Sequence, residues 1–180
     1  MTPLEIIGQV ISIIAVLITF LTYQMRTSRA IMLTLSIATL VSCIAYALLG
    51  GTTALGLNLF SIVRNICYYH KDKKFLSGKA IPIILSTIIV ILSAFLWEGY
   101  YSIFFVVGLA LNTLAMGYFG PQNLRKSILL TSSLILIYNL LMPIPSIGGI
   151  INEMVAISSS VIGLIRYRKV REKAQAQKEA

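Results

Sequence analysis

Asparagine and tyrosine side chains interrupt the long apolar runs of this sequence at related places. They are Tyr46, Asn58, Tyr138, Asn139 and Asn152. A buried amide without a hydrogen-bonding partner costs several kcal/mol, so these groups should face the interior of whatever the apolar runs build. Amides that donate and accept hydrogen bonds, together with aromatic rings that stack, suit a small, neutral, polar solute.

Each pair of these residues has two interpretations. Asn58 and Asn152 would bind a solute, or they would hydrogen-bond between helices, as polar side chains in membranes often do. Tyr46 and Tyr138 would line a pocket, or they would belong to the aromatic belt at a membrane interface.

Two charged residues lie within the same apolar runs. Glu153 is either a proton-coupling carboxylate or an anion favoured by the positive end of a helix dipole. Arg64 would hold an anionic solute, pair with a backbone carbonyl, or extend its head group to the membrane surface.

Other polar residues extend the pattern inward. At 1.5 Å per residue, Asn112 and Arg64 lie about 16–18 Å from the outer ends of their helices, which predicts a polar path through the protein. Gln24 and Gln122 end two apolar runs at the opposite side, where they would form an inner gate or cap a helix.

The elements that must position these groups are membrane-spanning helices. Hydrophobic residues make up 57% of the 180-residue chain and charged residues 12%, about half the fraction usual in soluble domains. This composition excludes a soluble enzyme, a disordered protein and a nucleic-acid-binding domain. A span needs about 20 apolar residues. We expect seven spans, at 4–23, 30–49, 53–69, 79–97, 101–119, 126–142 and 147–166.

Lysine and arginine gather in alternate connections and after the last span. This distribution follows the positive-inside rule and predicts an outside N-terminus and an inside C-terminus. It also explains the net charge of +9 without a nucleic-acid partner. The basic tail from Arg166 to Lys178 would be drawn to anionic lipid. Glu98, which precedes a glycine in a connection, is expected on the outer surface.

The first three and last three spans resemble each other weakly. Tyr46 and Tyr138 occupy related places in the second and sixth spans, and Asn58 and Asn152 in the third and seventh. A single intervening helix would make the two three-helix units parallel, an arrangement known in transporters. The expected organisation is 3+1+3, with parts 1–70, 71–99, 100–168 and 169–180.

This layout resembles known families. The stretches from Leu57 through Arg64 and from Ser146 through Glu153 are similar to the YgjV family of bacterial inner-membrane proteins. The 3+1+3 plan, Pro121-Gln122 and the paired asparagines resemble the SWEET and PQ-loop transporters. The SWEET resemblance implies facilitated sugar movement, in which two three-helix bundles rock about an asparagine from each, here Asn58 and Asn152.

The sequence therefore predicts an all-α polytopic protein of the bacterial inner membrane that moves a small solute by alternating access. The solute would be sugar-like or, less favoured, like a nucleoside or vitamin. The alternative is a receptor or accessory subunit that binds a lipid or protein and moves nothing. Enzymatic activity, cofactors and metal ions are not expected, because no carboxylate dyad, histidine cluster or nucleophile–base pair lies in the spans. Expected partners are membrane lipid, the solute and, in a homo-oligomer, a second copy, but not nucleic acid.

Overall fold

The computed structural model describes residues 2–22, 28–70, 78, 80–119 and 121–179, with the side chains of 22, 28–29, 121–122 and 169–179 left out. Within these residues it contains seven α-helices and no strand. The helices are α1 (Pro3–Thr22), α2 (Ser28–Leu49), α3 (Thr52–Tyr69), α4 (Ile81–Phe95), α5 (Ser102–Tyr118), α6 (Pro121–Leu141) and α7 (Ile147–Glu179).

The surface of α1 shows which solvent surrounds the protein. Ile6, Val10 and Leu17 are each about half exposed or more, whereas Gln9 and Ser12 are buried. A helix of a water-soluble protein has the opposite distribution. The aliphatic outer face is suited to lipid, and the polar residues are kept for contacts inside the bundle.

Among the described residues, four helical stretches are long and apolar enough to cross a membrane. They are Pro3–Leu21, Ala30–Leu49, Asn123–Leu141 and Ile147–Arg168. The apolar helices Ile81–Phe95 and Ser102–Tyr118 are shorter. The predicted all-helical membrane protein is confirmed, and seven spans stay a prediction.

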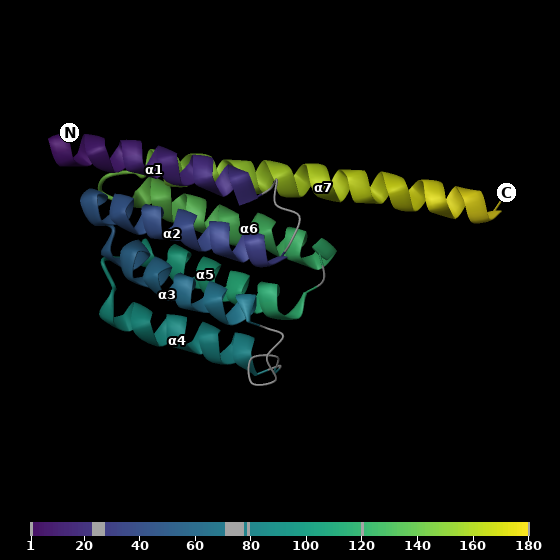
Figure 1. Cartoon of the computed structure of the whole chain (residues 1–180), viewed down its shortest axis with the longest axis horizontal. Helices are drawn as coiled ribbons and strands as arrows, with labels where there is room; N and C mark the ends of the chain where they lie inside the picture. The colour runs from purple at the N-terminus through teal and green to yellow at the C-terminus, as the bar shows by residue number, and fades with distance from the viewer. Residues whose placement is uncertain (1, 23–27, 71–77, 79, 120, 180) are drawn as a thin grey trace.

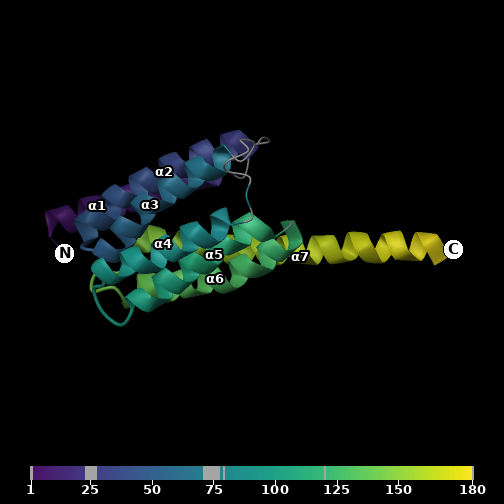
Figure 2. The same ribbon diagram turned by 90° about the horizontal axis from the view of Figure 1, so that it is seen from below.

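The helices pack in chain order as two groups. α1, α2 and α3 follow one another, as do α5, α6 and α7, and Figure 2 shows the two groups as separate layers. The backbones of the two layers approach most closely between α1 and α7 and between α3 and α5, while α4 packs on α5 and α3. In Figure 1, α1, α3, α5 and α7 all start at the same end of the bundle.

Two helix boundaries differ by more than two residues from the sequence prediction. The sixth helix begins at Pro121 rather than 126, because proline fits the first turn, where its missing N–H is not needed. The seventh helix continues to Glu179 instead of ending at 166, because the basic tail consists largely of good helix formers. Figure 1 shows α7 projecting beyond the other helices.

The turn between α2 and α3 positions Tyr46, near the end of α2, against the core. Gly50 has φ +77°, a left-handed conformation that glycine adopts without strain. The Gly51 amide donates to the Tyr46 carbonyl at 2.9 Å, which closes the end of α2. Tyr46 thereby joins a buried core that includes Leu57, Phe105 and Tyr138.

Candidate functional site

A cavity of about 190 Å³ lies between the two helical layers. Its lining comes from α1, α2, α3, α5, the start of α7 and Ile135 of α6. For scale, an apolar cavity of about 150 Å³ holds one benzene molecule. Six residues predicted from the sequence line this cavity together: Tyr46, Asn58, Arg64, Asn112, Asn152 and Glu153.

Helical periodicity brings the lining residues onto shared faces. On α3, Asn58, Ser61 and Arg64 follow at three-residue intervals and all reach the cavity. On α5, Leu109 and Asn112 do the same. Polar groups from both layers therefore face one partly open cavity.

Two of the lining amides have no hydrogen-bonding partner among the described residues. Asn58 and Asn112 both line the cavity and are partly buried, and neither side chain bonds to another described group. An amide carries two donors and an acceptor oxygen. These two side chains can therefore bind a molecule inside the cavity without breaking a contact of the fold.

The start of α7 places a carboxylate in the same space. Glu153 is buried, and its Oε1 accepts a hydrogen bond from Asn152 Nδ2 at 3.0 Å. Ser132 of α6 also hydrogen-bonds to the Glu153 side chain. Asn152 thus reaches the cavity while it orients the neighbouring carboxylate.

The guanidinium of Arg64 is fixed by neutral groups. It is 4% exposed, and its Nη1 donates to Thr113 Oγ1 at 3.0 Å. Its Nε and Nη2 donate to Asn65 Oδ1 at 3.3 and 3.2 Å. Neither Arg64 nor Glu153 forms an ion pair with another described residue.

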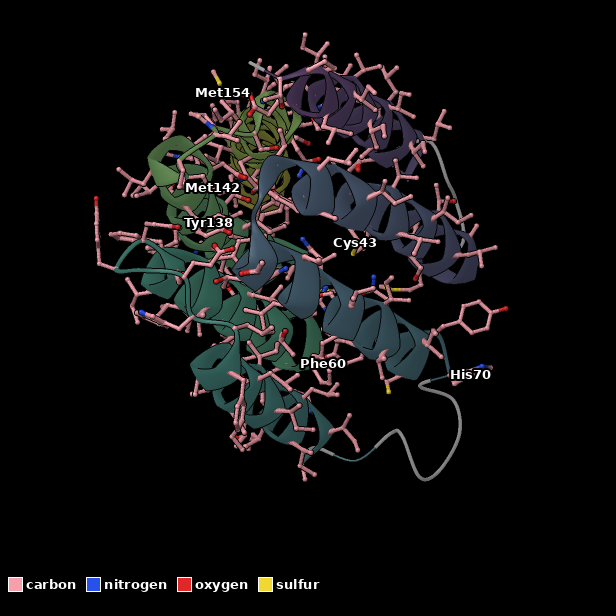
Figure 3. All side chains as sticks on the ribbon, turned by 90° about the vertical axis from the view of Figure 1, so that its left-hand side faces the viewer. Cys43, Phe60, His70, Tyr138, Met142 and Met154 are labelled. Atoms are coloured by element: carbon pink, nitrogen blue, oxygen red, sulfur yellow. The ribbon has the colours of Figure 1, made fainter. Side chains whose placement is uncertain are left out.

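Tyr138 and Asn139 lie behind the cavity wall rather than in it. The Tyr138 hydroxyl donates to Glu98 Oε2 at 3.2 Å, and its ring packs on Phe105 with ring centroids 4.9 Å apart. Asn139 donates to the Ile135 carbonyl at 3.0 Å and accepts from Tyr46 at 2.8 Å. Figure 3, which looks along the helices, shows Tyr138 inside the bundle.

Glu98, which was expected on the outer surface, is partly exposed and also contacts the core. Its Oε2 accepts the hydrogen bond from Tyr138, and its Oε1 is buried without a partner in the described residues. The predicted gate role of Gln24 and Gln122 stays a prediction, because Gln24 and the side chain of Gln122 lie outside the described residues.

The sequence prediction did not include the residues of α1 that hydrogen-bond to the start of α7 beside the cavity. Gln9 Nε2 donates to the Pro145 carbonyl at 2.7 Å, and Gln9 Oε1 accepts from the Ile147 amide at 2.9 Å. One turn further on, Ser12 Oγ accepts from the Gly148 amide at 3.1 Å. A glutamine inside an apolar helix was the available signal, because such a residue needs a partner.

The helix surfaces and the cavity together define the class of protein. A helical protein with an aliphatic exterior and a polar internal cavity is a protein of the membrane. The family model of the bacterial inner membrane protein Imp-YgjV matches residues 6–171, so the chain belongs to this family. Searches of curated proteins and of solved structures found no match.

Proposed function

We propose that this inner-membrane protein transports a small polar solute, which binds in the cavity between the two helical layers. The observation that carries the proposal is the composition of that cavity, because unpaired amides and charged side chains are costly in a membrane interior. Asn58 and Asn112 make no hydrogen bond to other described residues, so folding alone does not account for them.

The proposed mechanism is a rocking of α1–α3 against α5–α7 about the bound solute. Two observations support it: both layers contribute polar lining, and few helix pairs connect them. Asn58 and Asn152 occupy related places on α3 and α7, as expected for two parallel three-helix units joined by α4. We further propose an outside N-terminus and an inside C-terminus, based on the basic residues in alternate connections.

The size of the cavity limits the solute. A volume of about 190 Å³ is below the 300–1,000 Å³ typical of drug-sized ligands. The neutral, sugar-like solute predicted from the sequence would have to be no larger than a monosaccharide. A disaccharide or a nucleoside would require the layers to separate further.

Transport is tested by access to the cavity from both sides of the membrane. Single cysteines replacing Asn58 and Asn112, in a background without Cys43 and Cys67, are treated with a membrane-impermeant thiol reagent from either side. Transport predicts that Asn58→Cys is labelled from outside and Asn112→Cys from inside. Leu140→Cys is the control that should stay unlabelled, because Leu140 lies exposed on the apolar exterior.

The alternative of a receptor or accessory subunit gives a different result. Labelling from one side only, under all conditions, would contradict transport and favour a receptor. Exchange of labelled solutes in proteoliposomes then identifies what is moved. If no sugar, amino acid, organic acid or nucleoside exchanges across vesicles that hold folded protein, the proposed function is wrong.

A further inference from the structure

The cavity contains one buried positive charge and one buried negative charge that do not pair with each other. Among the described residues, Arg64 hydrogen-bonds to Thr113 and Asn65 alone, and Glu153 to Asn152 and Ser132 alone. Burying a charge without a counter-ion is costly, and proteins in membranes keep such groups mainly for function. Among the described residues, each charge is therefore without a counter-ion in the partly open cavity that both line.

The two charges lie at different depths. α3 begins at Thr52 and α7 at Ile147, at the same end of the bundle (Figure 1). At 1.5 Å per residue, Glu153 lies about 9 Å from that end and Arg64 about 18 Å. The two residues are therefore offset by roughly 9 Å along the bundle axis, on two helices whose backbones do not contact each other among the described residues.

This separation leaves room for one small molecule between them. A small zwitterion can reach both charges only if its carboxylate and its ammonium turn toward opposite parts of the lining. The cavity volume of about 190 Å³ agrees, because it exceeds only modestly the space that holds the six carbon atoms of benzene.

Neutral groups at each end fit the same ligand. Asn58 is as far along α3 as Glu153 is along α7, so its amide oxygen can accept from an ammonium group. Asn112 lines the same cavity at about the depth of Arg64, so its amide can donate to a carboxylate held by the guanidinium.

We infer that the cavity binds a small zwitterion of amino-acid size, with its carboxylate on Arg64 and its ammonium on Glu153. This inference rests on the proposed transport function and specifies its solute. It departs from the sugar-like solute that the sequence predicts, because a sugar would leave both buried charges uncompensated.

Binding to the full-length protein in detergent tests the inference. The probes are five zwitterions, namely alanine, serine, valine, proline and 4-aminobutyrate, with D-glucose as the neutral comparison. Ligand-induced thermal stabilisation reports binding, because a ligand stabilises by RT ln(1 + [L]/Kd). We expect at least one zwitterion to bind and exchange in proteoliposomes, with its amide and its hydroxy acid each binding about 30-fold more weakly or worse.

Two variants assign each charge to its residue. Arg64→Gln should bind the amino acid no better than its amide, because the amide lacks only the carboxylate. Glu153→Gln should bind the amino acid no better than its hydroxy acid, because the hydroxy acid lacks only the ammonium group. Arg166→Gln, on the exposed part of α7, and Glu98→Gln, outside the cavity lining, are the matched controls that keep both preferences. If either cavity variant fails to fold, the comparison of ligand analogues on the unmodified protein still decides.

The outcomes separate the two proposals. Exchange of glucose, but of no zwitterion, would overturn this inference and leave transport standing. Equal binding of the amino acid, its amide and its hydroxy acid would also overturn it. No exchange of any solute would overturn both.

Discussion

The hydroxyl of Tyr46 on α2 donates a hydrogen bond of 2.8 Å to Asn139 Oδ1 on α6. The two residues are 93 positions apart in the chain, and both are buried. This bond joins the two helical layers directly behind the cavity. It gives Asn139 a structural role, whereas the sequence suggested contact with solute.

Replacement of Tyr46 by phenylalanine tests the strength of this link. The ring would stay packed on Phe105, but Asn139 Oδ1 would lose the hydroxyl donor inside the core. We expect the free energy of unfolding in detergent to fall by about 1–3 kcal/mol. The control is Tyr100→Phe, since Tyr100 is 74% exposed, and an equal loss in both variants would contradict the assignment.

Asn58 and Asn112 should separate binding from stability. Since neither side chain bonds to a described residue, Asn58→Ala and Asn112→Ala should change unfolding by no more than about 0.5 kcal/mol. Both should weaken solute binding measurably. Asn139→Ala should do the reverse and cost about 2 kcal/mol or more, because two buried hydrogen bonds are lost. A stability loss at Asn58 like that at Asn139 would assign Asn58 to packing.

Gly148→Ala tests the close approach of α1 and α7. A Cβ at this position would collide with the backbone of Ser12, which cannot move without moving α1. We expect the variant to lose about 1–3 kcal/mol of stability, the usual cost of overpacking. Gly78→Ala is the matched control, because the nearest atom to its new Cβ is 3.9 Å away. Unchanged stability and unchanged α1–α7 cross-linking in Gly148→Ala would contradict the observed packing.

Gln9→Leu tests the junction that starts α7. The substitution keeps a similar volume but leaves the Pro145 carbonyl and the Ile147 amide without their partner. Hydrogen exchange at the Ile147 amide should become at least about tenfold faster, since its buried acceptor is gone. The Ile150 amide serves as the internal reference, because it donates to the Ser146 carbonyl rather than to Gln9. Equal protection at Ile147 before and after the change would rule out this role for Gln9.

The hydrophobic pattern of the sequence by itself determines the helical class and the approximate helix positions. Long apolar runs, broken by short polar connections, predicted the helices, and α2 and α3 begin and end within a few residues of the expected positions. The cost of burying amides and charges indicated that Asn58, Asn152, Arg64 and Glu153 face inward, because lipid cannot satisfy them. Both signals are local, so the sequence carries them directly.

Only the tertiary structure decided which inward-facing groups share a cavity and which hold the fold together. Tyr138 and Asn139 have the same character in the sequence as Tyr46 and Asn58, yet they bond to Glu98 and Tyr46 and are fully buried. Periodicity gives the face of a helix but not its neighbour, and hydrogen-bond partners depend on that neighbour. The separate placement of Arg64 and Glu153 in one space likewise follows from packing α3 against α5 and α7 against α6, which residue types alone do not specify.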